Sequence, residues 1–180
     1  MFKGRFEKIK SLISDAASQD LPQIAHIHGK LFPRGWSVAE IEALSRQADC
    51  EILVAQRVGG GGREILGFNI IRKAADEAEI LSIAVHDKYH RHGIAENLMR
   101  DAILRLRRDR ITQLFLEVDA TNAAAAQLYK KLGFQIVGTR PGYYERPAKP
   151  ADRKPDGTGA DDETKPKARS AALIMRLDLV

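Results

Sequence analysis

The sequence predicts an α/β fold in which one mixed sheet carries helices on both of its faces. Two strand-like segments, 51–58 and 63–74, follow each other across a glycine-rich turn. Further along, segments 78–86, 93–109 and 111–119 form a strand–helix–strand series. A tight turn joins antiparallel strands whereas a crossover helix joins parallel ones, so the sheet must be mixed. The length of 180 residues suits one domain, which we expect to span the whole chain.

Two helices are predicted before the first of these strands. Residues 20–32 form the first, with Asp20 as its N-cap and Pro22 in its first turn, where a missing N–H is tolerated. The letters SVAE begin the second at Ser37, because a Ser and a Glu three residues apart form a capping box. We expect this helix to end near residue 47, and we assign no structure to the segment 8–17.

The remaining elements follow from apolar runs and their boundaries. Gly59 to Gly62 form a hairpin turn between two strands, and Thr121 to Gly133 form a helix with the glycine at its C-cap. The amphipathic segment 93–109 is a further helix. Strands are predicted at 51–58, 63–74, 78–86, 111–119, 134–140 and 172–179.

The segment 147–170 differs in composition from the rest of the chain. It holds no Val, Ile, Leu, Met or aromatic residue, and it contains Pro147, Pro150, Pro155 and Pro166. Such a segment buries too little apolar surface to offset the entropy lost on ordering. We therefore predict a long mobile loop between the last two strands.

Composition excludes several classes of protein. The net charge of +5 suits an anionic partner without choosing among nucleic acid, an acidic membrane surface and a phosphorylated ligand. Cys50 is the only cysteine and the five histidines form no metal-binding pattern, so we expect neither a disulfide nor a metal site. No apolar run has the length of a signal peptide or of a membrane span. We expect a cytoplasmic monomer or weak dimer that does not bind membranes.

The letters HRHGIA at 90–95 place positive charge and a glycine between a strand and a helix. Unpaired N–H groups and partial positive charge at a helix N-terminus favour an anion, above all a phosphate. The segment lacks the GK[ST] of a P-loop and the glycine pattern of a dinucleotide fingerprint. A phosphate site and a solvated basic turn remain equally possible on this segment alone.

The context of this turn resembles the Gcn5-related N-acetyltransferases. The letters from 79 to 133, with AVH before the turn and LEV, TNAAA and LYKKLG after the helix, match that superfamily in order and spacing. Within it, the likeness is greatest to the bacterial ribosomal-protein alanine N-acetyltransferases, and GYY, LIM and FPRGWS also recur there. The resemblance implies a mostly antiparallel sheet, acetyl-CoA as cosubstrate and a protein N-terminus, such as that of a small-subunit ribosomal protein, as acceptor.

The resemblance also implies roles for particular residues. Glu117 would be the general base, acting through water, and Tyr129 the general acid toward the thiolate. Two backbone segments and one side chain would bind the cofactor: Ile83, Ala84 and Val85 along the pantetheine arm, Arg91, His92, Gly93, Ile94 and Ala95 around the pyrophosphate, and Asn122. The family usually carries Gln or Arg at the position of His90 and Gly at that of Ala95, and neutral imidazoles at 90 and 92 bind phosphate less well than guanidinium does.

Each residue also has a simpler interpretation. Glu117 could be a solvated strand residue, Tyr129 a core aromatic and Asn122 a first-turn polar residue. Cys50 begins an apolar strand and is expected to be inert rather than an acetyl carrier. The basic run Arg105, Arg107, Arg108 and Arg110 is expected to be a solvated face rather than an RNA site. Lysine side chains or small amines remain alternative acceptors, and a non-catalytic acyl-CoA-binding regulator is an alternative of another class.

Overall fold

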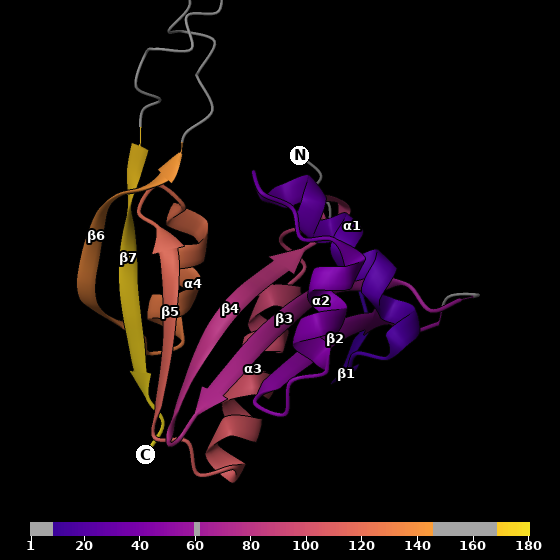
Figure 1. Ribbon diagram of the computed structural model, residues 1–180, viewed down its shortest axis with the longest axis horizontal. Helices are drawn as coiled ribbons and strands as arrows, with labels where there is room; N and C mark the ends of the chain where they lie inside the picture. The colour runs from indigo at the N-terminus through magenta and orange to yellow at the C-terminus, as the bar shows by residue number, and fades with distance from the viewer. Residues whose placement is uncertain (1–8, 60–61, 146–168) are drawn as a thin grey trace, which may run out of the picture. The chain divides into compact units, whose positions relative to one another are not determined.

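The computed structural model describes residues 9–59, 62–145 and 169–180 (Figure 1). Seven strands form one sheet in the order β1-β2-β3-β4-β5-β7-β6. Contacts divide the chain into two compact units, Met1–Leu116 with Leu177–Val180, and Glu117–Arg176. Among the pairs β1–β2, β2–β3, β3–β4, β4–β5 and β6–β7, whose register the described residues show, only β4–β5 is parallel, which confirms the predicted mixed and mostly antiparallel sheet.

The first unit holds an antiparallel meander. Its strands are β1 (Ser11–Asp15), β2 (Cys50–Arg57), β3 (Ile65–Ala74) and β4 (Glu77–Val85). β5 (Gln113–Asp119) runs parallel to β4, with its residues 113–116 in register with 77–80. The helix α3 (Ile94–Arg108) makes the crossover between them, as a parallel connection requires.

Helices cover both faces of this meander. α1 (Leu21–Leu31) and α2 (Val38–Ser45) bury Ile24, Ile27 and Ile41 against β2 and β3 on one face. On the other face α3 contacts β2, β3 and β4, and its Met99 lies against Asn69 of β3. Apolar side chains on both faces of the central strands explain why residues 65–71 are buried without a break.

A bulge interrupts the pairing of β3 with β4. Ile71 pairs with Ile80 and Ile70 pairs with Ser82, so Leu81 is an extra residue on β4. The bulge directly follows the stretch of β4 that is in register with β5. It therefore changes the course of β4 just before the residues expected to bind the pantetheine arm.

The second unit contains the end of β5, α4 (Ala123–Lys131), β6 (Gln135–Glu145) and all but the last two residues of β7 (Arg169–Asp178). β6 and β7 pair antiparallel, and their register begins with Glu145 opposite Arg169. Asp119 at the end of β5 accepts hydrogen bonds from the Thr121 N–H and from the Ser170 hydroxyl, both at 2.8 Å. These two hydrogen bonds connect the turn that precedes α4 with β7.

Several sequence predictions need correction. Asp20 is the N-cap residue of α1 as predicted, but its side chain makes no capping hydrogen bond: its carboxylate accepts from the Ala17 N–H at 2.8 Å and pairs with Arg63 at 2.6 Å. The helix predicted from Thr121 to Gly133 is shorter: Asn122 is the N-cap of α4, and Gly133 (φ 97°) follows the C-cap Leu132. The unassigned segment 8–17 contains the strand β1.

Other predictions hold with adjusted ends. Ser37 and Glu40 form the predicted capping box, although α2 ends at Ser45. β6 runs to Glu145, and β7 takes up residues 169 and 170 of the predicted loop. The rest of that loop, and Gly60 and Gly61 of the glycine turn, lie outside the described residues.

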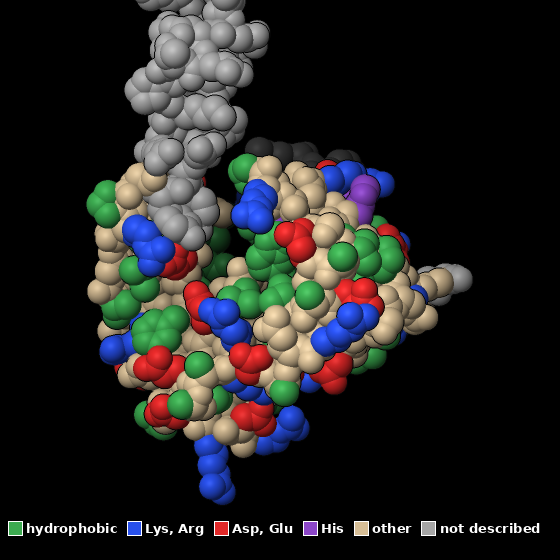
Figure 2. All heavy atoms as spheres, viewed as in Figure 1, with side chains coloured by type: hydrophobic (Ala, Val, Ile, Leu, Met, Phe, Trp, Pro, Cys, Tyr) green, Lys and Arg blue, Asp and Glu red, His purple; other side chains and the backbone are tan. Residues whose placement is uncertain are grey.

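The basic run at the end of α3 is engaged in part by contacts within the protein, while Arg107, Arg108 and Arg110 stay exposed. Arg105 pairs with Asp101 at 2.6 Å, Asp15 at 2.5 Å and Glu51 at 3.1 Å. Arg107 donates to the Leu179 carbonyl at 3.1 Å. On the face shown in Figure 2, basic and acidic side chains are interspersed. Arg105 is therefore a structural residue of α3, and the exposed arginines after it form the solvated face that the sequence predicts.

Candidate functional site

The turn between β4 and α3 has the backbone geometry of an anion site. Arg91 (φ 65°) and Gly93 (φ 78°) both adopt the left-handed region, and Gly93 is the N-cap of α3. The first N–H groups of a helix have no acceptor within that helix. A Cβ at Gly93 would meet no atom within 4 Å, so the space beside this turn is open. The turn therefore fits a phosphate group placed at the N-terminus of α3.

The two unusual histidines brace this turn. His90 Nε2 lies 2.7 Å from the Val85 carbonyl oxygen, and because a carbonyl only accepts, Nε2 must carry a proton. His92 Nδ1 lies 3.0 Å from the His90 carbonyl and donates to it by the same argument. His90 thus links the turn to the end of β4. Sequence reasoning treated both residues as weak phosphate ligands and did not foresee this role.

Ile83, Ala84 and Val85 form the last part of β4, opposite Asn69, Phe68 and Gly67 of β3. Ala84 and Val85 are buried. A Cβ at Gly67 would lie 2.6 Å from the Ala84 carbonyl oxygen, so β3 approaches β4 too closely there for any larger residue. The close pairing holds this end of β4 in place directly before the turn.

Glu117 of β5 forms an ion pair with Arg140 of β6. The carboxylate Oε1 lies 3.0 Å from Nη2 of Arg140, and the Glu117 side chain is 22% exposed. The alternating burial of β5 places Leu116 and Val118 on the buried face and Glu117 on the other. Glu117 is therefore neither a solvated residue nor a core residue but a half-buried carboxylate with a fixed cationic partner.

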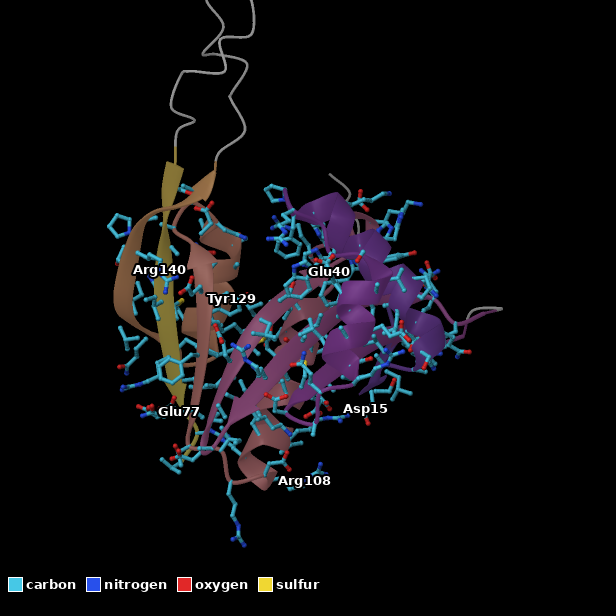
Figure 3. The ribbon with its side chains drawn as sticks, in the orientation of Figure 1. Asp15, Glu40, Glu77, Arg108, Tyr129 and Arg140 are labelled. Carbon is cyan, nitrogen blue, oxygen red and sulfur yellow. The ribbon has the colours of Figure 1, made fainter. Side chains whose placement is uncertain are left out.

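Tyr129 of α4 is buried, and its ring lies 5.8 Å from that of Phe134 at 57°. Figure 3 shows Tyr129 on α4, beside β5, and Arg140 on β6. Asn122 accepts a hydrogen bond from the Ala125 N–H at 3.1 Å through its side-chain oxygen. Its oxygen therefore caps α4, which leaves the amide nitrogen as the group that could reach a ligand.

The structure groups the predicted site residues by unit. Residues 83–85 and 91–95 belong to the first unit, joined by the bond from His90 to Val85. Glu117, Asn122 and Tyr129 belong to the second. Sequence reasoning missed Arg140, because the partner of a strand carboxylate depends on strand order. The only indication of Arg140 in the sequence was the presence of an arginine shortly before the letters GYY.

Cys50 takes no part in either group. It is partly buried at the start of β2, and burial, with a contribution from Asp49, raises the pKa of its thiol. A protonated thiol is a poor nucleophile. Among residues 9–59, 62–145 and 169–180, no three His, Cys, Asp or Glu side chains gather in a way that could hold a metal ion. No helix of this part of the chain is long and apolar enough to cross a membrane.

The fold and the geometry of the turn between β4 and α3 fit one class of protein, the N-acetyltransferases that use acetyl-CoA. The acetyltransferase (GNAT) family matches residues 21–134, and the chain belongs to that family. The expectation of an acetyl-CoA-dependent enzyme is thereby confirmed. The turn at 91–95 fits the pyrophosphate of acetyl-CoA by its backbone conformation and its open space.

Individual relatives show which members of this family the chain is similar to. The chain is 35% identical over 132 residues to the ribosomal protein bS18-alanine N-acetyltransferase of Escherichia coli (strain K12), which covers 73% of this chain and 86% of that protein. It is 28% identical over 138 residues to the putative enzyme of the same name from Bacillus subtilis (strain 168), over 76% of this chain and 89% of that protein. The crystal structure of the Escherichia coli S18-alanine enzyme superimposes with a TM-score of 0.74 and 28% identity, covering 94% of each chain. Arabidopsis thaliana NAA60 in complex with acetyl-CoA shares the fold, with a TM-score of 0.72 at 17% identity over 94% of this chain and 98% of that one.

Proposed function

We propose that this enzyme transfers the acetyl group of acetyl-CoA to the N-terminal α-amine of ribosomal protein bS18 in the cytoplasm. The observation that carries the choice of acceptor is the 35% identity to the Escherichia coli bS18-alanine enzyme over 73% of this chain. The resemblance of FPRGWS and GYY to segments of that family supports the same choice.

The proposal assigns cofactor binding mainly to the first unit. The N-terminus of α3 and the turn from Arg91 to Ala95 would hold the pyrophosphate, since positive φ angles at two residues turn N–H groups outward. The backbone of Ile83 to Val85 would pair with the pantetheine arm as an added strand does. The amide nitrogen of Asn122 would complete the binding.

Glu117 and Tyr129 would move the protons of the reaction. Acetyl-CoA supplies a thioester carbon, which the acceptor nitrogen attacks, and a thiolate leaving group. An N-terminal amine has a pKa near 8, so at neutral pH it must lose a proton before it attacks. Glu117 would take this proton through a water molecule, and the Tyr129 hydroxyl would protonate the departing thiolate sulfur. Both substrates are then bound together, and no covalent acetyl-enzyme forms.

Arg140 supports this assignment because it fixes one oxygen of Glu117. With Oε1 held at 3.0 Å from the guanidinium, the second oxygen keeps a defined direction toward a water molecule or amine. A carboxylate that rotated freely would spend less time in a reactive geometry.

The decisive experiment is mass spectrometry of acceptors incubated with acetyl-CoA and the purified enzyme. The panel contains the bS18 N-terminal peptide, the same peptide with a blocked α-amine, a lysine peptide with a blocked N-terminus, and a small diamine. We expect acetylation of the first peptide alone, at its α-amine. Acetylation of the blocked peptide or of the lysine peptide instead would assign the enzyme to side-chain amines, and a preference for the diamine would replace the protein acceptor by a small molecule.

A further inference from the structure

The chain directly before the turn 90–95 is held by a cluster of three side chains, Arg57, Glu64 and Tyr89. The Tyr89 hydroxyl donates a hydrogen bond to Oε1 of the Glu64 carboxylate. The other carboxylate oxygen, Oε2, lies 3.3 Å from Nη1 of Arg57. The guanidinium of Arg57 also lies over the Tyr89 ring, 5.4 Å from its centroid. Each member of the cluster thus contacts the other two.

The hydrogen bond in this cluster has a definite direction. A carboxylate only accepts, so the phenol is the donor. The bond to Glu64 raises the pKa of Tyr89, and the phenol therefore keeps its proton at neutral pH. Hydrogen bonds to an ionised acceptor are stronger than those between neutral groups. The contact is therefore a strong point of attachment for Tyr89.

The cluster joins two separate parts of the first unit. Arg57 ends β2 and Glu64 directly precedes β3, and the Arg57 N–H donates to the Glu64 carbonyl at 3.0 Å. Tyr89 ends a short 3-10 helix, Asp87–Tyr89, which follows β4 and leads into His90. The cluster therefore connects the β2–β3 hairpin with the segment that carries the turn.

Glu64 has a fixed backbone, because the chain on either side of it is bound to α1. The side-chain amide of Gln23 donates to the Arg63 carbonyl at 3.0 Å, and its oxygen accepts from the Ile65 N–H at 3.0 Å. The Arg63 guanidinium pairs with Asp20 at 2.6 Å, and Asp20 is fully buried. One glutamine thus holds both peptide groups that flank Glu64, which makes Glu64 a fixed point for Tyr89.

Two adjacent residues attach the turn at two places. Tyr89 is bound to Glu64, and His90 is bound to the Val85 carbonyl at 2.7 Å. Arg91 follows with a φ of 65°, a conformation that residues other than glycine adopt at a cost and keep only where the surroundings hold them. The two attachments directly before Arg91 supply that constraint.

We propose that Glu64 and Tyr89 are positioning residues that hold the turn 90–95 in the conformation that binds the pyrophosphate of acetyl-CoA. This inference rests on the proposed function, which assigns the pyrophosphate to that turn. Neither side chain binds the cofactor itself. Tyr89 acts through the backbone that follows it, and Glu64 acts through Tyr89. Loss of their hydrogen bond lowers the fraction of the protein in which the turn is competent, and the apparent Kd rises in proportion.

Tyr89→Phe is the principal test because it removes one hydroxyl and no charge. The ring beneath Arg57 stays in place. The Glu64 side chain is 41% exposed, so water can solvate the oxygen that loses its donor, and the variant should fold. We expect the Kd for acetyl-CoA, measured by calorimetry without an acceptor, to rise about fivefold or more. The melting temperature of the variant is measured alongside.

A double-mutant cycle shows whether Glu64 acts through Tyr89. Glu64→Ala removes the acceptor of the hydrogen bond and should raise the Kd by a similar factor. The variant that combines Glu64→Ala with Tyr89→Phe should bind no more weakly than either single variant, because all three lack the same hydrogen bond. Glu64→Gln keeps an oxygen that can accept from the phenol and should lie closer to the wild type.

Glu79 provides a matched control on the same meander. Its carboxylate lies 3.1 Å from Arg72 and is 46% exposed, which is close to the 3.3 Å and 41% of Glu64 beside Arg57. Arg72 and Glu79 are register partners in β3 and β4, on the far side of the bulge from the turn. Glu79→Ala removes an equivalent ion pair and should keep the Kd for acetyl-CoA within about twofold of the wild type.

Steady-state kinetics separate positioning from chemistry. The acceptor is whichever amine of the panel the wild type acetylates. Tyr89→Phe should raise the KM for acetyl-CoA, whereas kcat and the acceptor KM at saturating acetyl-CoA should match those of the wild type. A variant that was merely less well folded would lose kcat as well.

The outcomes distinguish this inference from the proposed function. An unchanged Kd in Tyr89→Phe, with Arg91→Glu binding weakly, would overturn the positioning role and leave the pyrophosphate at the turn. Additive losses in the double variant would overturn the action of Glu64 through Tyr89, and an equal loss in Glu79→Ala would indicate general loosening and overturn the inference. Wild-type affinity in Arg91→Glu would sink the assignment of the pyrophosphate and this inference together. Failure to acetylate the bS18 peptide, with another amine accepted, would sink the proposed acceptor alone.

Discussion

The ion pair between Glu117 and Arg140 shows how a contact with another side chain changes the chemical role that can be assigned to a residue. A glutamate within an apolar strand is most simply a solvated side chain, but here its carboxylate lies 3.0 Å from a guanidinium. His90 changes its meaning in the same way, because its ring donates to the Val85 carbonyl. For both Glu117 and His90, one contact therefore decides which chemical role the side chain can have.

Glu117→Gln should lower kcat by about 10²–10⁴, the range typical for removal of a general base. The loss should shrink as pH rises, because an acceptor amine with a pKa near 8 then deprotonates without help. Steady-state rates from pH 6.5 to 9.5 measure this. Glu79→Gln, on β4 and paired with Arg72, serves as the matched control. A loss that is constant across this range would exclude Glu117 as the base.

Cys50→Ala should retain wild-type activity. Burial raises the pKa of this thiol, so little thiolate is present at neutral pH to accept an acetyl group. Initial rates at several fixed acetyl-CoA concentrations should give intersecting lines, as direct transfer requires. Parallel lines together with an acetylated Cys50 trapped in the absence of acceptor would mean that the transfer is not direct.

The turn from His90 to Ala95 is the element to which we assign the pyrophosphate of the cofactor. Its two left-handed residues and the N-terminus of α3 have a geometry that suits an anion, and its histidines hold it to β4 and to itself. The positive charge needed for phosphate binding therefore falls mainly to Arg91 and to the helix end.

Arg91→Glu should raise the Kd for acetyl-CoA tenfold or more, which corresponds to about 1.4 kcal/mol. The variant reverses one charge beside the expected pyrophosphate, and calorimetry measures the effect. Arg100→Glu, on the exposed side of α3, is the control for a change in net charge. Affinity that matches the wild type would place the pyrophosphate elsewhere.

His90→Ala should weaken acetyl-CoA binding severalfold, whereas His90→Gln should largely preserve it. Glutamine can still donate to the Val85 carbonyl, and it occurs at this position in the family that the sequence resembles. The comparison of the two Kd values by calorimetry separates a brace from a phosphate ligand. Equal weakening in both variants would argue that the imidazole itself touches the cofactor.

At the scale of the whole molecule, most of the residues proposed to bind the cofactor lie in the first unit, and the residues proposed to transfer protons lie in the second. The first unit carries the turn from His90 to Ala95, and the second carries Glu117, Tyr129 and Arg140. The bulge at Leu81 and the ion pairs of Arg105 belong to the scaffold of the first unit.

Replacement of residues 146–168 by a short Gly/Ser linker should leave the melting temperature almost unchanged. Glu145 and Arg169 are register partners, so the flanking ends of β6 and β7 already lie side by side and a short loop can join them. The replaced residues include none of the large apolar types that build a core. A drop of several degrees in a thermal melt would contradict this expectation, and loss of activity with an unchanged melt would assign the segment to the acceptor.

Most of the fold could be predicted because its signals are local. Ser37 and Glu40 cap α2 as expected, Gly93 opens α3, and the apolar runs became strands within one to five residues of their predicted ends. β1 was missed because it is a short edge strand whose burial alternates irregularly. Asp20 stands at the predicted N-cap position of α1, but its carboxylate forms an ion pair with Arg63 rather than a hydrogen bond to the helix.

The sequence by itself determined the order of elements, the class of enzyme and the turn that suits a phosphate, since each depends on residue spacing and on backbone preference along a continuous stretch. Only the tertiary structure decided that Arg140 meets Glu117, that His90 braces β4 and that the His28 ring accepts a hydrogen bond from the Trp36 N–H after α1. Arg140 meets Glu117 through the order of the strands, which the letters of the sequence do not reveal. The two histidine contacts span only five and eight residues, but they depend on the backbone conformation of a turn and a loop, which residue spacing alone does not determine.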